Sequence, residues 1–216
     1  MIAIRPQSDV YLVLNIPFTK NTPQSNFQTF FQRSRIILNP ALRPPINNDV
    51  IDVPPSTLNG LYLCKEWLHR CVIGHEQCHS TMSNRRSPTR LIFIRGLSLR
   101  VCETAGNIGS IKYATLSHCW GGKDFLKLVR ANLASFQVKI PYEDLSNTFQ
   151  DAIFIARYLG FEHLWIDSLC IIQDDEDDWA TESTLMTDVY GGSHLNIAAV
   201  SAENGDAGCF FKRNRN

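Results

Sequence analysis

The residues best suited to chemistry lie in the stretch 164–190, which reads LWIDSLCIIQDDEDDWATESTLMTDVY. An apolar run over 164–172, interrupted at Asp167, predicts a buried strand, and residues with helical spacing follow an acidic segment. A strand, a polar loop and a helix form the repeating unit of parallel α/β sheets, whose ligand sites lie where the strands end. We therefore expect Asp167, the acidic segment and the first turns of the helix to belong to an active or binding site.

The carboxylates of this stretch can serve structure or chemistry. The acids 174–178 precede a helix, where they complement its dipole and cap its free amides, and we favour this interpretation over a divalent cation site. Glu182 shares a helix face with Trp179, and burial beside an indole would raise its pKa as a general acid or base requires. A surface glutamate is the alternative. Asp167 within an apolar strand needs a partner or a cleft, because an unpaired buried charge is costly.

A second group of reactive side chains closes the predicted strand 111–120, IKYATLSHCW. Ser117, His118 and Cys119 stand just before a glycine pair, so they form either a pocket wall or the polar end of a core strand. Consecutive strand residues point to opposite faces, so His118 cannot easily activate either neighbour, and the sequence has no Gly-x-Ser-x-Gly elbow. These observations argue against a serine or cysteine hydrolase.

The composition limits the choice of partners and compartment. The 216 residues include 21 basic and 21 acidic side chains, and this net charge of zero gives no reason to expect nucleic acid or an anionic membrane as a partner. We find no apolar run of membrane-spanning length and no secretory signal in the first residues. Seven cysteines, an odd number without a signal peptide, predict free thiols and a cytoplasmic protein.

Residues 1–55 differ from the rest because they hold eight of the ten prolines, which disfavour long regular elements. We expect an irregular N-terminal extension there, with a short strand at 11–14 and a short helix at 24–38. A helix is then predicted from about Leu61, with recurring residues that invite a zinc interpretation: Cys64, Cys71, His75 and Cys78. Their spacing fits the buried stripe of a helix better than a structural zinc site, whose ligands come in close pairs.

The remaining elements alternate in the manner of an α/β domain. We predict strands at 89–94, 97–101, 111–120, 164–172 and 195–200, and helices at 124–135, at 148–160 and from 179 onward. Thr148 and Asp151 resemble a capping box. The expected fold is a flavodoxin-like, mostly parallel sheet flanked by helices, with strands 111–120 and 164–172 as parallel neighbours at its centre. The expected divisions are a Pro-rich extension (1–55), a helical arm (56–84) and the α/β domain (85–211).

Three blocks of the sequence carry a family resemblance. The first is YATLSHCWG at 113–121, the second is LWIDSLCIIQ at 164–173 with the helix after it, and the third comprises 195–201 and 208–210. Together they resemble the signatures of the fungal heterokaryon-incompatibility (HET) domain, and the segment around Trp67 and the run 88–91 resemble what often precedes it. His118 is a departure, since the family often has tyrosine there.

The resemblance implies a role in non-self recognition and programmed cell death in filamentous fungi. The HET domain is also similar in architecture to TIR domains, some of which cleave NAD with a glutamate on the corresponding helix. A TIR-like fold and a catalytic Glu182 are therefore expected, with Asp167 and Ser117 assisting and NAD as the substrate, without a metal or resident cofactor. The further residues expected to line the ligand site are Trp120, Trp179, Gly121, Cys170 and Gln173.

A second class of function stays open: a non-enzymatic scaffold that self-associates or binds other proteins of the incompatibility system. A convergent polar pocket around Ser117, Asp167 and Glu182 would favour the enzyme, whereas an exposed apolar patch on the helices would favour the scaffold. A classical dinucleotide-binding dehydrogenase is excluded, because the sequence lacks a Gly-x-Gly-x-x-Gly loop.

Overall fold

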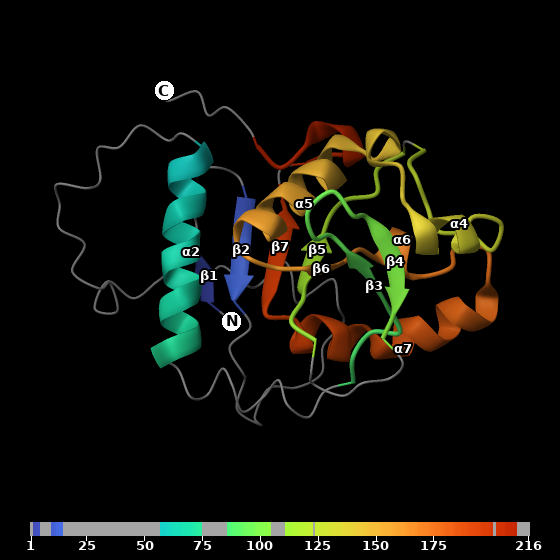
Figure 1. The fold of residues 1–216 in the computed structure, drawn as a ribbon, viewed down its shortest axis with the longest axis horizontal. Coiled ribbons are helices and arrows are strands. Elements are labelled where there is room, and N and C mark those ends of the chain that lie inside the picture. The colour runs from blue at the N-terminus through green and yellow to red at the C-terminus, as the bar shows by residue number, and fades with distance from the viewer. Residues whose placement is uncertain are drawn as a thin grey trace, which may run out of the picture.

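A mixed seven-stranded sheet with the strand order β1-β2-β7-β5-β6-β3-β4 forms the centre of the molecule (Figure 1). The structure is a computed structural model that describes residues 2–4, 10–14, 57–74, 86–104, 111–122, 124–200 and 202–210. The strands are β1 (Ile2–Ile4), β2 (Val10–Leu14), β3 (Arg90–Phe93), β4 (Arg100–Glu103), β5 (Ala114–Ser117), β6 (His163–Trp165) and β7 (Leu195–Ala199). The helices are α2 (Thr57–Gly74), α4 (Leu133–Val138), α5 (Asn147–Tyr158), α6 (Asp167–Cys170) and α7 (Glu176–Gly192), with 3-10 turns at Tyr142–Asp144 and Gly205–Ala207.

The central strand β5 lies between β6 and β7 and runs parallel to both. The predicted parallel pairing of the two apolar signature strands at the centre of the sheet is therefore confirmed. The chain leaves β5 through α5 to reach β6, and returns through α7 to reach β7 on the other side of β5. Because both crossovers are expected to be right-handed, the two helices must cover opposite faces, as Figure 1 shows.

The expectation of a mostly parallel sheet is wrong, although the α/β class is confirmed. Only the β5–β6 and β5–β7 pairs of the described strands are parallel. The predicted hairpin β3–β4 joins the sheet through an antiparallel β3–β6 pair, and β1–β2 joins it through an antiparallel β2–β7 pair. A hairpin reverses direction at its turn, so one strand of any added hairpin must oppose the central set.

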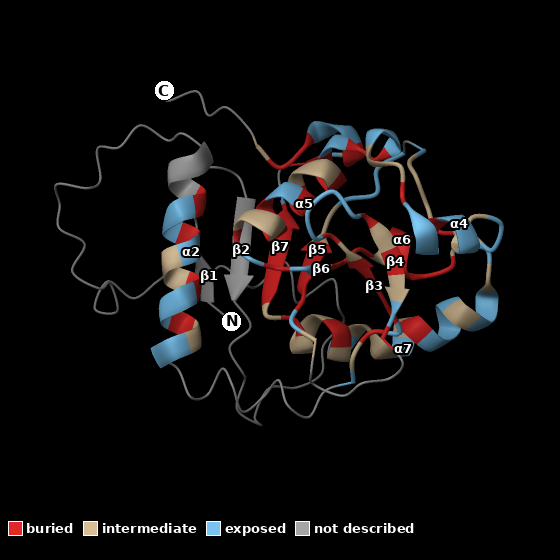
Figure 2. Ribbon diagram, viewed as in Figure 1, coloured by how far each residue is buried: buried red, intermediate tan, exposed pale blue. Residues whose placement is uncertain are grey.

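The core fills the space between the sheet and α5. Figure 2 shows buried residues concentrated in β5, β6 and β7 and on the face of α5 toward them. Phe149, Ala152, Ile153 and Ala156 on α5 are fully buried, as the face of a helix that packs on a sheet must be, and Trp165 at the end of β6 is also fully buried. Large buried side chains of this kind carry most of the hydrophobic stabilisation of a domain.

Two predicted strands end earlier than their apolar patterns suggest. The strand expected to reach Trp120 ends at Ser117, and the strand expected over 164–172 ends at Trp165. Asp167 then begins the single helical turn α6, where its Oδ1 accepts the Ser168 amide at 2.7 Å. Asp167 is thus not inside a strand but directly after one, in the first turn of α6, where its carboxylate satisfies a free amide of that turn.

The helix expected at 124–135 is wrong. A helix occupies only Leu133–Val138, and the preceding segment is a loop over 124–129 that ends in a turn at 130–132. The Leu128 amide donates to the Ser168 carbonyl, and the Leu128 carbonyl accepts from the Gln173 amide, both at 2.8 Å. These long-range hydrogen bonds satisfy the backbone of the segment, so a local helix is not needed.

The predicted helix at 148–160 is confirmed as α5, but its capping box is wrong. Ser146 is the N-cap and makes no side-chain cap hydrogen bond. Thr148 Oγ1 instead accepts from the Gly208 amide at 3.2 Å, and an Asp151 carboxylate oxygen accepts from the Cys209 amide at 2.7 Å. The first turn of α5 therefore holds the segment after β7 in place.

The N-terminal predictions are only partly covered by the described residues. The short strand at 11–14 is confirmed as β2, and the predicted apolar stripe is confirmed by the burial of Cys64 and Cys71 on α2. His75, Cys78 and the expected helix at 24–38 lie outside the described residues. The boundaries expected between the extension, the helical arm and the α/β domain, at 55/56 and 84/85, stay predictions. Within the described ranges, none of the helices has an apolar stretch that could span a bilayer.

Candidate functional site

A hydrogen bond between Trp120 and Asp167 brings together two predicted site residues at the carboxyl ends of β5 and β6. Trp120 Nε1 donates to Asp167 Oδ2 at 2.9 Å, although the residues are 47 positions apart. The Asp167 side chain is 22% exposed and Trp120 is 37% exposed, so the carboxylate and the indole both reach solvent. An oriented carboxylate beside an exposed ring at this edge of the sheet is a suitable place for a ligand.

His118 lies behind this pair and is far less accessible. Its side chain is 2% exposed and packs edge to face against Phe149, with ring centroids 5.0 Å apart. Its Nδ1 is 3.9 Å from Asp167 Oδ1, and its buried Nε2 has no hydrogen-bond partner among the described residues. Burial lowers the pKa of His118, and the nearby Asp167 carboxylate opposes that shift. A largely neutral imidazole therefore supports the site from behind.

Ser117 belongs to a polar network between β5, β7 and α7. Ser117 Oγ and Thr115 Oγ1 both donate to Asn196 Oδ1 at 3.2 Å, and the Tyr190 hydroxyl donates to the Leu116 carbonyl at 3.3 Å. Burial raises the pKa of Tyr190; the Asp167 carboxylate raises it further, while a hydrogen bond with Ser117 lowers it. Ser117 and Asp167 thus both act on the Tyr190 phenol, which stays protonated and can donate.

Glu182 lies in a different, buried cluster. Glu182 is 1% exposed, and its Oε1 is 3.8 Å from Nη2 of Arg90. The same Nη2 lies 2.5 Å from both carboxylate oxygens of Asp178, and Arg90 Nε donates to the Cys170 carbonyl at 2.8 Å. Glu182 and Tyr190 are eight residues apart on α7, which separates their backbones by about 12 Å. The predicted convergence of Ser117, Asp167 and Glu182 is therefore incomplete, since Ser117 and Asp167 meet around Tyr190 without Glu182.

The environment of Glu182 is not the one expected from its spacing to Trp179. Trp179 is 57% exposed, so the indole extends to solvent and does not bury the carboxylate. Both Glu182 oxygens are buried without a hydrogen bond of ordinary geometry within the described part of the chain. Burial raises the pKa of Glu182, as does the Asp178 carboxylate, while contact with Thr89 and the Arg90 charge lower it.

Three other predicted ligand-site residues have structural contacts. Cys170 is fully buried, and burial raises the pKa of its thiol. Gln173 Nε2 donates to the carbonyls of Asp167 at 3.2 Å and Ile171 at 3.0 Å, which closes the turn after α6. Gly121 has a φ of +61°, and a Cβ there would lie 2.7 Å from the Asn204 Cβ. Gly121 therefore lets the chain after Trp120 pack on the segment after β7.

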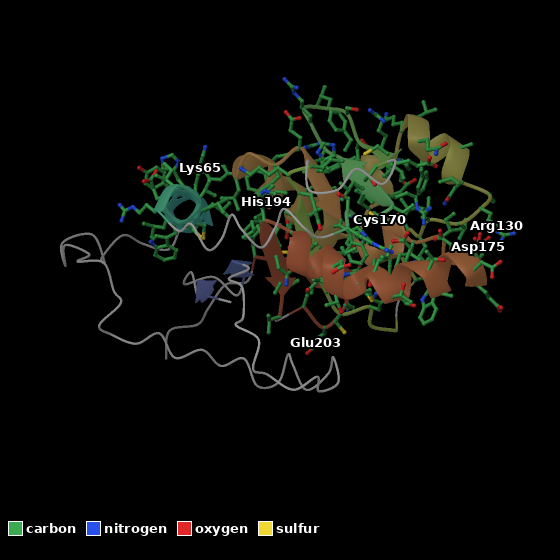
Figure 3. The ribbon with its side chains drawn as sticks, turned by 90° about the horizontal axis from the view of Figure 1, so that it is seen from below. Lys65, Arg130, Cys170, Asp175, His194 and Glu203 are labelled. Carbon is green, nitrogen blue, oxygen red and sulfur yellow. The ribbon has the colours of Figure 1, made fainter. Side chains whose placement is uncertain are left out.

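The acids at the start of α7 cap that helix, as predicted. Asp175 is the N-cap residue, and its Oδ1 accepts from the Asp178 amide at 3.2 Å. Its Oδ2 also accepts from Arg130 Nε at 3.0 Å and forms an ion pair with Nη2 at 2.8 Å, and Figure 3 shows the two side chains together at the N-terminal end of α7. In the same view Cys170 lies in the interior beside α7.

The sequence analysis missed three residues: one beside Glu182 and two beside Trp120. Arg90 pairs with Asp178 and lies beside the buried Glu182, and Phe125 and Lys127 lie against the Trp120 ring. Phe125 and Lys127 fall in a segment expected to be helical, so nothing in their spacing indicated that they accompany Trp120. Arg90 stands in the run that resembles the segment before the HET domain, which was its only signal.

Comparisons with known proteins agree with the resemblance in the three sequence blocks. A comparison with curated proteins found no match, and a comparison with solved structures found none, so a TIR-like architecture stays a prediction. Residues 113–216 match the family model described as heterokaryon incompatibility protein (HET). The matched region holds β5, α5, β6, α7 and β7, together with Trp120 and Asp167. By this match, the part of the chain from residue 113 to residue 216 belongs to the heterokaryon incompatibility family.

Proposed function

We propose that this chain acts in non-self recognition in filamentous fungi and causes programmed cell death by hydrolysing the nicotinamide–ribose bond of NAD. Membership of the HET family supports the biological role. The observation that carries the chemical part is the Asp167 carboxylate, held by the Trp120 indole at the carboxyl ends of two parallel strands. The free thiols of the described cysteines are compatible with action in the cytoplasm.

The proposed chemistry needs a carboxylate that the substrate can reach. Cleavage of the bond between the ring nitrogen and ribose passes through a transition state that resembles an oxocarbenium ion, which a nearby negative charge stabilises. Asp167 fits this requirement better than Glu182, because it is partly exposed whereas Glu182 is buried beside Arg90. Trp120 would stack on the nicotinamide ring. Ser117 and Tyr190 would donate hydrogen bonds to the substrate by giving up those to Asn196 Oδ1 and to the Leu116 carbonyl. Water then bonds to the ribose carbon and one proton is released.

The decisive experiment compares wild type, Asp167→Asn and Glu182→Gln for nicotinamide release from NAD and for killing of a fungal host. Both substitutions keep the shape of the side chain and remove its charge. We expect Asp167→Asn to lower the rate of release by about 10²–10³, the usual effect of removing one electrostatic contact to a transition state. Glu182→Gln should keep most of the activity.

The same measurements can overturn the proposal. Loss of release in Glu182→Gln with an intact fold would assign the catalytic charge to Glu182, as the resemblance to TIR domains implies. A wild-type protein that kills cells but releases no nicotinamide would eliminate the enzyme and leave the scaffold.

A self-associating scaffold is the second candidate, and the outer surface of α5 supports it. Phe154 is 42% exposed, and its ring lies 6.4 Å from that of Tyr158 and 6.3 Å from that of Phe210. Aromatic residues gathered on a helix surface are typical of protein-binding sites. In this alternative the partner is a second copy or another protein of the incompatibility system. A strict monomer in light scattering at high concentration that still kills cells would count against it.

A further inference from the structure

One ammonium group of the chain faces both aromatic rings at the candidate site. The rings of Trp120 and Phe125 meet edge to face, with centroids 5.3 Å apart and planes at 80°. Lys127 Nζ lies 5.7 Å from the centroid of the Trp120 ring and 5.2 Å from that of the Phe125 ring. Both distances are within the range of cation–π attraction, so the two rings together form a surface that accepts a positive charge.

The Asp167 carboxylate strengthens this preference for a cation. Trp120 Nε1 donates to Asp167 Oδ2 at 2.9 Å, and donation to an anion leaves more electron density on the indole ring. The carboxylate also adds a negative charge beside the rings. A neutral ring would gain stacking from this surface but would not gain either electrostatic contribution.

Lys127 is held weakly enough to leave. Its side chain is 33% exposed, and its ion-pair partner Asp124, at 3.4 Å, is 96% exposed. Ion pairs so close to bulk water contribute little to the stability of one side-chain position. The ammonium can therefore rotate into solvent when another cation arrives, while the rings and Asp167 stay in place.

We propose that Trp120, Phe125 and Asp167 form a subsite for a cationic ring, and that Lys127 occupies this subsite until the ligand displaces it. The inference rests on the proposed function, which makes the ligand the positively charged nicotinamide ring of oxidised NAD. The subsite then selects the oxidised cofactor, because the reduced ring is neutral and would displace Lys127 without replacing its charge.

The subsite also explains how product would leave. When the bond between nitrogen and ribose breaks, its electron pair stays on the ring nitrogen, and water supplies the oxygen that bonds to the ribose carbon. The ring thereby changes from a cation to neutral nicotinamide. Lys127 can then return to the rings, since the product no longer offers a charge.

The test uses two small probes that differ in charge: the 1-methylnicotinamide cation and neutral nicotinamide. Binding of each to the full chain is followed by the NMR signal of the Trp120 indole N–H, which is identified by its loss in Trp120→Phe. We expect the cation to bind at least several-fold more tightly than the neutral ring. Lys127→Met keeps the apolar stem but removes the competing charge, so it should tighten binding of the cation about 2- to 5-fold. It should tighten binding of the neutral probe less, because that probe is relieved of competition for the rings but not of charge repulsion.

Lys112→Met is the matched control, because Lys112 Nζ lies 5.2 Å above the Phe161 ring, before the start of β5 and away from Asp167. It should leave the affinity for both probes unchanged. Equal affinity of wild type for the two probes would overturn the inference, as would weaker or unchanged cation binding in Lys127→Met. Nicotinamide release from NAD is measured separately. Release without charge selection would reject only the subsite, and charge selection without release would reject only the hydrolase.

Discussion

Asp167 and Glu182 are carboxylates from adjacent parts of one sequence block, yet they lie in opposite environments. The Asp167 side chain is 22% exposed and accepts hydrogen bonds from Trp120 Nε1 and the Ser168 amide. Glu182 is 1% exposed, has no hydrogen bond of ordinary geometry among the described residues beyond its contact with Thr89, and shares the Arg90 guanidinium with Asp178. The first carboxylate can meet a ligand without any movement of the chain, whereas the second is enclosed by its own domain.

The comparison shows that position on a motif does not decide what a carboxylate does. Glu182 stands three residues from Trp179 in the sequence but makes no hydrogen bond to it, whereas Asp167 accepts one from Trp120, 47 positions away. A buried carboxylate beside an arginine contributes mainly to the arrangement of the fold, because its charge is already compensated. An exposed and oriented one keeps its charge available for chemistry. Four substitutions test this division, in decreasing order of expected effect.

The largest effect is expected from Arg90→Leu, which removes the cation that the two α7 carboxylates share. The buried Glu182 and Asp178, whose side chain is 16% exposed, would lose their counter-charge, and breaking a buried pair typically costs about 3–5 kcal/mol of unfolding free energy. Urea denaturation at neutral pH measures it. The matched control is Arg95→Leu, since the Arg95–Glu162 pair spans 3.4 Å between side chains that are 72% and 50% exposed. The control should change stability by less than about 1 kcal/mol. Equal losses in both variants would refute a special role for the buried cluster.

Gly121→Ala is expected to have the next largest effect on stability, and it acts beside the pair of Trp120 and Asp167. Gly121 has a φ of +61°, and its new Cβ would lie 2.7 Å from the Asn204 Cβ and 3.0 Å from the Glu203 carbonyl oxygen. Strain of this kind costs about 1–3 kcal/mol and should also displace Trp120. Gly122→Ala is the control, because a Cβ there meets no atom within 4 Å. Urea denaturation and nicotinamide release are measured for both. A loss of stability without a loss of release would show that the turn does not position the site.

Trp120→Phe should have a smaller effect on stability than either. It removes one hydrogen bond to a partly exposed carboxylate, worth about 0.5–1.5 kcal/mol, and keeps an aromatic ring. The comparison variant is Trp179→Phe, at a position that is 57% exposed, where almost no change in unfolding free energy is expected. If Trp120→Phe instead destabilised the protein as much as Arg90→Leu, the bond between Trp120 and Asp167 would serve the fold. The proposed difference between the roles of Asp167 and Glu182 would then be refuted.

The central part of the fold could be predicted from the sequence because its residues are apolar in unbroken runs. Ala114, Leu116 and Leu164 are fully buried, as strands covered on both faces must be, and their parallel pairing follows from the helix between them. The ends of those strands could not be predicted. The run Leu169–Ile172 suits a strand or a helical turn equally well, and the choice depends on hydrogen bonds to Leu128, more than forty residues away.

A residue of the candidate site could be predicted only where its type stands out from its neighbours in the sequence. A lone carboxylate within an apolar run identified Asp167, whereas Trp120 was expected only from the family resemblance. The pairing of Arg90 with Asp178 joins residues 88 positions apart, and no local pattern reports such a contact. Glu182 was given a catalytic environment because helical spacing to Trp179 says which side chains are neighbours, but not which of them faces the core.

The smallest effect is expected as a difference in pH dependence between wild type and Glu182→Gln. Burial raises the pKa of Glu182 above its ordinary value of 4.5, so the folded chain holds this proton more tightly than the unfolded chain does. The stabilisation from protonated Glu182 is therefore complete below pH 4.5 and is lost as the pH rises through the raised pKa of the folded state. The glutamine variant does not titrate there. The unfolding free energy of wild type minus that of the variant should fall from pH 4 toward neutral pH, as measured by urea denaturation in steps of half a pH unit. A difference that rises with pH would mean that the Arg90 charge outweighs burial, and Glu182 would then be an ionised partner of Arg90 in the folded protein.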